Sequence, residues 1–209
     1  MIRCLLIGDS HIPRRSQHVP YKITHKLNDL IGQKLFDYTF FTGDLITASD
    51  FIDFLNLKTQ NEIFIVMGNM DYFSGDNTSP IYEELQVSFS DNEEMTIGLT
   101  HGAQIKPRGD HSYLEKLAIH KEYDLLISGH THKEEVFLTK QGILLLNPGS
   151  VTGVWSFVAS EIPSFITLQI NEESKEISVK IFQFERNSDK ITEISSYFIF
   201  KNNQIQLRY

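Results

Sequence analysis

The chain has 209 residues, of which 41% are hydrophobic and 22% are charged, and its formal net charge is −8. This length and composition predict a soluble globular protein with a full hydrophobic core. The negative charge argues against a general affinity for nucleic acid or anionic membranes, because neutralising phosphates requires clustered Lys and Arg. The single cysteine, Cys4, excludes an intrachain disulfide, and no apolar stretch approaches the ~20 residues of a membrane span. We therefore expect a cytoplasmic protein that does not insert into membranes.

Strands and helices alternate in the first part of the chain. Apolar runs predict strands over 2–7, 38–42 and 62–67, and apolar residues at helical spacing predict helices over 21–33 and 49–57. This alternation is typical of a largely parallel sheet with crossover helices. The stretch 72–80 is rich in Gly, Asn and Asp, and we expect an exposed loop there.

The second part of the chain is richer in strands. We expect strands over 86–90, 95–100, 124–128, 135–138, 143–146, 164–170, 177–184, 191–200 and 204–207, with a helix over 112–120 and a turn over 147–150. No linker interrupts the sequence, which predicts one domain over 1–186 and a β-rich extension over 187–209 packed on it. Five phenylalanines in apolar runs are expected in the core: Phe36, Phe40, Phe41, Phe64 and Phe89.

Five of the predicted strands end in residues that can bind a metal ion. The side chains at these ends are Asp9, His11, Asp44, Asn69, His101, His130 and His132. In an open α/β sheet such strand ends converge on one crevice. A mixture of carboxylate, amide oxygen and imidazole suits Mn, Zn or Fe better than Ca. Seven ligands exceed one tetrahedral site, so we expect two divalent metal ions that share a bridging carboxylate.

The order of these motifs (Gly-Asp-x-His, Gly-Asp, Gly-Asn, His-Gly, Gly-His-Thr-His) resembles that of the calcineurin-like metallophosphoesterases. The resemblance runs from Ile2 to Ile170. It is strongest to a compact subgroup that holds small bacterial and archaeal phosphodiesterases and the phosphoesterase-like subunit of retromer, a coat of vacuolar protein sorting. The fold that the resemblance implies is an α/β, four-layer α-β-β-α sandwich of two mixed sheets, here with a β-rich C-terminal extension.

The resemblance also implies how the ligands divide. One ion is expected on Asp9, His11, Asp44 and His132, and the other on Asp44, Asn69, His101 and His130. The two ions are expected to clamp a small phosphodiester substrate while a hydroxide held between them attacks in line. Asp44, Asn69 and His101 are the residues expected nearest to the reaction.

Two positions depart from the pattern of larger family members. Met70 stands where many of them carry a histidine that protonates the leaving oxygen, and a thioether cannot act as an acid. We therefore expect modest hydrolysis, best on esters with acidic leaving groups. Ala103 stands where relatives often have histidine. Asp71 is expected to hold His11 or another ligand, and Asn147 to line the crevice or to hold its turn.

A second function remains open, in which the fold is a scaffold that binds a helical-solenoid protein partner of retromer type. In that case the chain would lie at endomembranes through its partner. Scaffold use needs an exposed apolar patch, and Ile105 in the loop after His101 is the candidate. The charged Lys106 weakens this hypothesis, and the retained Asp44 favours an enzyme. For Trp155 we expect packing in the core or at the rim rather than stacking on substrate.

Overall fold

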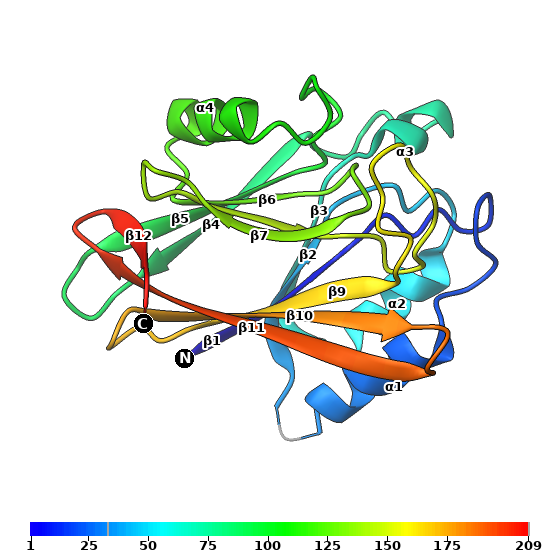
Figure 1. Cartoon of the computed structure of the whole chain (residues 1–209), viewed down its shortest axis with the longest axis horizontal. Helices are drawn as coiled ribbons and strands as arrows, with labels where there is room; N and C mark the ends of the chain where they lie inside the picture. Colours follow the sequence, from blue (N-terminus) through cyan, green and yellow to red (C-terminus); the bar gives the residue numbers. More distant parts are fainter. Residues whose placement is uncertain (33, 209) are drawn as a thin grey trace.

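The computed structural model describes residues 1–32 and 34–208, which form two mixed β-sheets (Figure 1). The larger sheet has the strand order β12-β11-β10-β9-β1-β2-β3 and the smaller sheet β4-β5-β6-β8-β7. The larger sheet consists of β1 (Ile2–Ile7), β2 (Phe36–Phe41), β3 (Thr59–Ile65), β9 (Ser164–Ile170), β10 (Glu176–Glu185), β11 (Lys190–Lys201) and β12 (Gln204–Leu207). The smaller sheet consists of β4 (Tyr82–Ser88), β5 (Glu94–Thr100), β6 (Leu125–Ser128), β7 (Glu134–Leu138) and β8 (Leu144–Pro148). The helices are α1 (Tyr21–Leu30), α2 (Ser49–Asn56), α3 (Asn69–Phe73) and α4 (His111–Lys121).

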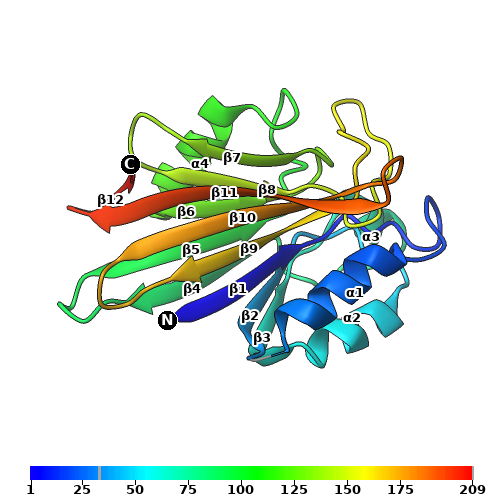
Figure 2. The same ribbon diagram turned by 60° about the horizontal axis from the view of Figure 1, so that its bottom comes forward.

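Three hydrophobic clusters stack these elements into layers. The central cluster joins the two sheets, with Leu6 and Phe40 from one and Leu99 from the other. A second cluster packs α1 and α2 on the outer face of the larger sheet, and both helices lie beside β1, β2 and β3 in Figure 2. A third cluster packs Leu114 of α4 on Leu126 of the smaller sheet. The order α-β-β-α confirms the predicted four-layer sandwich.

Strand β1 illustrates why the sequence folds in this way. Cys4 and Leu6 pack into the cluster between the sheets, whereas Leu5 and Ile7 pack toward α1 and α2. Successive side chains of a strand point to opposite faces, so a strand covered on both sides reads as one continuous apolar run. The parallel pairs β1–β2, β2–β3, β5–β6 and β6–β8 then bring their carboxyl ends to the same side of the molecule.

The structure differs from the sequence prediction mainly at element ends and in one short helix. The predicted strand 62–67 is β3, which begins three residues earlier at Thr59, and β8 extends into the predicted turn as far as Pro148. Helix α3 was not predicted, because five residues carry no readable period. Gln33, the last residue of the predicted helix 21–33, and Tyr209, the last of the predicted extension, lie outside the described residues.

The C-terminal segment adds strands to the larger sheet, as the predicted β-rich extension requires. Strand β11 pairs antiparallel with β10 along its length, and β12 pairs with β11. Phe198, Phe200 and Ile205 from these strands belong to the cluster between the sheets. The division at residue 187 stays a prediction. No helix within the described residues is long and apolar enough to cross a bilayer.

Candidate metal centre

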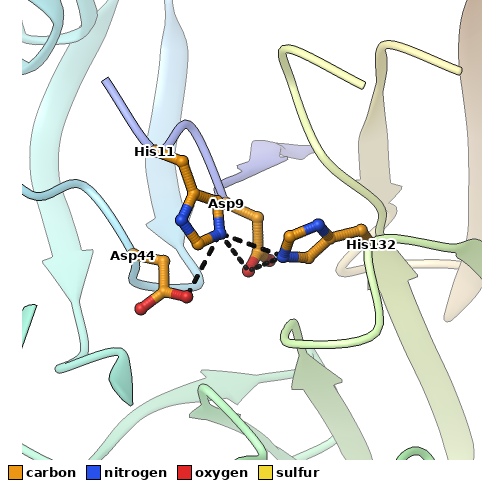
Figure 3. Close-up of side chains that lie close together, drawn as sticks. All are labelled: Asp9, His11, Asp44 and His132. Carbon is orange, nitrogen blue, oxygen red and sulfur yellow. Dashed lines mark hydrogen bonds and ion pairs between the residues drawn. The ribbon is translucent and has the colours of Figure 1, made fainter. Parts of the chain in front are cut away.

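Four buried side chains point toward one another beyond the carboxyl ends of β1, β2 and β6 (Figure 3). They are Asp9, His11, Asp44 and His132, and one donor atom from each lies within 4.8 Å of the others. His11 Nε2 lies 3.0 Å from His132 Nε2 and 3.2 Å from Asp44 Oδ2, and Asp9 Oδ1 lies 3.3 Å from His132 Nε2. Two ligands of one ion, each roughly 2.0–2.2 Å from it, lie roughly 3–4 Å apart. The four atoms therefore have the spacing of a metal-ligand shell.

A second group of donors surrounds His101, directly after β5. His101 Nε2 lies 3.1 Å from Asn69 Oδ1, 3.2 Å from His130 Nδ1 and 3.6 Å from Asp44 Oδ2. The same oxygen of Asp44 therefore lies beside a histidine of each group. This second group is more open than the first, because Asn69 and His130 are only half-buried.

Backbone carbonyls orient two of the imidazoles. His132 Nδ1 lies 2.9 Å from the carbonyl oxygen of Val154, and His101 Nδ1 lies 2.7 Å from that of Thr42. A carbonyl only accepts, so the proton of each ring is on Nδ1 and Nε2 presents its lone pair to the site. Lone pairs and carboxylate oxygens gathered in this way repel one another unless a cation lies between them. The donor set thus fits divalent metal ions.

The protonation states of the ligands also bear on metal binding. The pKa of His11 and that of His130 are both lowered to about 3, mainly by burial. Both rings are therefore neutral near pH 7. Burial also raises the pKa of Asp44 to about 6. Burial acts in the same direction on Asp9, but the nearby imidazoles, His132 foremost, together outweigh it and the pKa of Asp9 falls below its usual value. Neutral imidazoles and ionised carboxylates are the forms that bind metal ions. His132 differs from His11 and His130, because Asp9 raises its pKa against the effect of burial, and an ion has to displace the proton of this ring.

The backbone of the predicted ligands is strained. Five of the seven have a left-handed conformation: Asp9 (φ 49°), His11 (φ 49°), Asp44 (φ 56°), His130 (φ 68°) and His132 (φ 59°). Such a conformation costs on the order of 1–3 kcal/mol for a residue other than glycine. Residues with this strain are most frequent at active sites and ligand-binding sites. The chain therefore leaves each strand by a sharp turn that aims the next side chain into the crevice.

Two glycines next to the ligands are required by space. A Cβ on Gly68 would lie 2.1 Å from Asp44 Oδ1, and a Cβ on Gly129 would lie 2.5 Å from Asp9 Oδ2. Any larger residue would push these carboxylates out of place. The glycines that precede Asn69 and His130 in the sequence thus let the carboxylates approach.

Asp71 supports the centre through the backbone around Asp44. Its Oδ2 accepts hydrogen bonds from the backbone N–H groups of Asp44, at 2.7 Å, and of Gly68, at 2.9 Å, and its Oδ1 accepts from that of Ile46, at 2.7 Å. Of the two alternatives expected from the sequence, a contact with His11 or with another ligand, these bonds correspond to the second. Asp71 therefore fixes the loop that carries the shared carboxylate.

Asn147 joins two strand ends. Its Nδ2 donates to the carbonyl oxygen of Gly129, at 2.9 Å, and to Thr131 Oγ1, at 3.0 Å, while its Oδ1 accepts from the N–H of Gly149, at 2.9 Å. It thus holds its own turn and the segment that carries His130 and His132.

Sequence reasoning missed several residues that contact the ligands through neutral groups. Thr42 Oγ1 donates to Asp9 Oδ2 at 3.2 Å, and Ser150 Oγ donates to the Asp9 carbonyl at 2.7 Å. Hydroxyls at strand ends carry no periodic signal. Arg108 also contacts the segment that carries His130, since its Nη1 donates to the carbonyl of His130 at 3.1 Å.

Ile105 does not lie on an exposed patch. Only 7% of its surface is exposed, because it packs under α4 against Leu114 and Ala118. The apolar residue in this loop belongs to the core. The expectation of an apolar partner surface at Ile105 is thus wrong.

Comparisons with known proteins agree with this geometry. A family model described as the calcineurin-like phosphoesterase superfamily domain matches residues 2–173. A probable metallophosphoesterase of Methanothermobacter thermautotrophicus is 34% identical over 150 residues, which cover 70% of this chain and 76% of that protein.

Solved structures of similar fold include two proteins named Vps29. Wild-type Vps29 of Entamoeba histolytica, in complex with Zn²⁺, is 31% identical, with a TM-score of 0.77 over 93% of this chain and 99% of that one. Vacuolar Protein Sorting 29 of Cryptosporidium parvum is 29% identical, with a TM-score of 0.80 over 95% and 98%.

Proposed function

Because the chain belongs to the calcineurin-like phosphoesterase superfamily, we propose that it is a phosphodiesterase of modest rate that depends on two divalent ions. The observation that carries this proposal is the position of Asp44 between two groups of donors. One of its oxygens lies 3.2 Å from His11 Nε2 and 3.6 Å from His101 Nε2. A carboxylate so placed suits a bridge between two ions.

Each group of donors would hold one ion. Asp9, His11, Asp44 and His132 would hold the first, and Asp44, Asn69, His101 and His130 the second. Bound divalent ions supply positive charge for the phosphate oxygens and lower the pKa of a bound water. Mn, Zn and Fe suit this donor set.

The chain's own residues limit which ester is cleaved. Met70 follows Asn69 at the start of α3, and its backbone N–H donates to Asp44 Oδ1 at 2.7 Å. Its thioether has no proton to give to a leaving oxygen. Diesters whose leaving group is already acidic should therefore react best.

Hydrolysis of bis-p-nitrophenyl phosphate tests this function. We expect turnover with Mn²⁺ in the parent protein and a loss of at least about 100-fold in Asp44→Asn, because a shared ligand is removed. Asp53→Asn, on the exposed face of α2, is the matched control and should keep the parent rate. Equal rates in the parent and Asp44→Asn, or no rate in either, would contradict the proposal.

A second candidate function is that of a scaffold subunit that binds a helical-solenoid protein, which would place the chain in the cytoplasm at endomembranes. Similarity to Vps29 over most of the chain supports it. Exposed aromatic side chains beside the centre also support it: on α3, Tyr72 is 60% and Phe73 is 71% exposed. Such side chains are typical of protein interfaces.

Purification of the tagged protein from its source cell tests the scaffold function. We expect a stoichiometric partner that is lost when Tyr72 and Phe73 are both changed to alanine. Tyr21→Ala, an equally exposed tyrosine on α1, is the control and should retain the partner. Recovery of the parent chain alone would count against a scaffold.

A further inference from the structure

A pocket of about 350 Å³ adjoins the candidate metal centre. It lies between the loop after β1 and the segment 152–155 before β9, and its walls include Arg15, Trp155 and Arg186. The two loops, dark blue and yellow, lie side by side at the right of Figure 1. The volume falls within the range of about 300–1,000 Å³ that is usual for small-molecule sites.

Two walls of the pocket are bonded directly to candidate ligands. The backbone N–H of Arg15 donates to the carbonyl of His11 at 2.9 Å. The carbonyl of Val154 accepts from His132 Nδ1 at 2.9 Å. A group bound in the pocket would therefore lie beside a phosphate held at the first group of donors.

The pocket is positively charged although the chain carries a net charge of −8. Arg15 Nη1 donates to the carbonyl of Trp155 at 3.1 Å, and Arg186 Nη2 donates to that of Thr152 at 2.8 Å. Across residues 1–32 and 34–208, no carboxylate lies within 4.0 Å of either guanidinium. Each arginine is thus held in place by neutral carbonyls and keeps its charge and its other N–H donors for a ligand.

An exposed aromatic pair stands at the same place. Trp155 is 54% exposed, and its ring centroid lies 5.0 Å from that of Phe157 in an edge-to-face arrangement. Trp155 therefore lies at the rim and not in the core. From the sequence we expected this residue to pack rather than to stack on substrate, but its exposed ring favours stacking. An exposed indole beside guanidinium groups suits a ligand that is both planar and anionic.

We propose that this pocket binds a nucleotide unit, with its phosphate on Arg15 and Arg186 and its base stacked on Trp155. The inference rests on the proposed function, and it names the substrate class as phosphodiesters of short nucleotides that carry a second, terminal phosphate. Two arginines provide charge for one such phosphate, not for a long polyanion.

Intrinsic fluorescence tests the pocket independently of hydrolysis, because Trp155 is the only tryptophan of the chain. The full-length protein, in chelator to keep the metal centre empty, is titrated with adenosine 5′-monophosphate. We expect quenching of Trp155, and a dissociation constant at least about tenfold higher in Arg15→Gln, because a charge-assisted contact is lost. Arg14→Gln, which changes the adjacent arginine outside the pocket walls, should bind as the parent does.

Three results of this titration would overturn the proposal. They are no fluorescence change with the nucleotide, equal dissociation constants in Arg15→Gln and Arg14→Gln, and inorganic phosphate binding as tightly as the nucleotide. The last result would remove the role of the base and of Trp155. Circular dichroism of both variants shows that a loss of binding is not a loss of fold.

A second arm uses the Mn²⁺-loaded protein and two dinucleotides that differ only in the terminal 5′-phosphate, pApA and ApA. We expect kcat/KM to be about tenfold higher for pApA in the parent and in Arg14→Gln, and this preference to be lost in Arg15→Gln. If bis-p-nitrophenyl phosphate is cleaved but the nucleotide is not bound, only the present inference fails. If the nucleotide is bound but no diester is cleaved, the proposed function fails and the assignment of a nucleotide substrate falls with it.

Discussion

The two donor groups of the candidate metal centre differ in how far the chain alone organises them. Asp9, His11, Asp44 and His132 are all buried and bring one donor atom each within 4.8 Å of the others. In the second group, the contacts run through His101, and Asn69 and His130 are half-buried.

The difference follows from the elements that carry each group. The turn with Asp9 is tied down by Ser150 Oγ, which donates to the Asp9 carbonyl at 2.7 Å, and by the carbonyl of Gly43, which accepts from the Asp9 N–H at 2.9 Å. Asn69, in contrast, begins the five-residue helix α3, which exposes Phe73 to solvent. A preorganised site binds more tightly because less order is lost on binding. We therefore expect the first group to bind its ion more tightly than the second.

The largest effect should come from removing one histidine of each group. We expect His132→Ala to weaken the tighter of two Mn²⁺ binding events by more than about 100-fold. Loss of a residue that only hydrogen-bonds to a ligand lowers metal affinity by about 10–100-fold, and loss of a ligand itself should cost more. His130→Ala should weaken only the looser event. Isothermal titration calorimetry measures both, and equal losses of both events in either variant would erase the difference between the groups.

Asp71 tests how much metal binding depends on a residue that holds the backbone around a ligand without binding the ion. Its carboxylate accepts three backbone N–H groups around Asp44, and Asp71→Asn should therefore weaken Mn²⁺ binding by about 10–100-fold. Asp76→Asn is the matched control, because Asp76 likewise accepts the backbone N–H groups of Thr78 and Ser79, at 3.0 and 3.1 Å, but in an exposed turn. The same loss in both variants would mean that general destabilisation is responsible.

The pH dependence of Mn²⁺ binding should reflect the protonation of the Asp44 carboxylate. Its pKa is raised to about 6 by burial, so the metal-free protein holds a proton there below pH 6 and an ion has to displace it. Below pH 6 this proton should lower the affinity for Mn²⁺ by about tenfold per pH unit. A second proton is displaced at higher pH from His132, because Asp9 raises the pKa of that ring against the effect of burial. The pKa of His11, about 3, lies outside this window. In Asp44→Asn the slope below pH 6 should become shallower, and an unchanged slope there would assign the proton to another group.

Met70→His is expected to have the smallest effect, limited to one class of substrate. A histidine at the start of α3 could protonate a leaving oxygen, and we expect turnover of monoesters with poor leaving groups to rise by about tenfold. Turnover of bis-p-nitrophenyl phosphate should change little, because p-nitrophenolate leaves without a proton. No gain on the poor esters would mean that a missing acid does not limit the site.

The residue pattern alone predicted a largely parallel sheet with crossover helices, and the four layers of the fold were expected only from the resemblance to a known family. Runs such as 2–7 are apolar because both faces of β1 are covered, and parallel strands place their ends together. Asp44 and His101 were expected close together because both follow strand ends, and their atoms lie 3.6 Å apart although β2 and β5 belong to different sheets that face each other.

What the sequence could not reveal depends on contacts across the chain. Asp71 was expected on His11 or another ligand, and no pattern specifies that its carboxylate accepts the backbone N–H groups of Asp44 and Ile46. Ile105 is buried under α4, although an apolar residue in a loop suggests a surface patch. Arg15 and Arg186 are far apart in sequence and meet only in the folded chain.

The number of ions held by the chain tests the two-ion centre most directly. Elemental analysis of the parent protein after equilibration with Mn²⁺ and desalting should find two ions per chain, and Asp44→Asn should hold at most one. A single ion in both proteins, or two in both, would contradict an arrangement in which Asp44 bridges two ions.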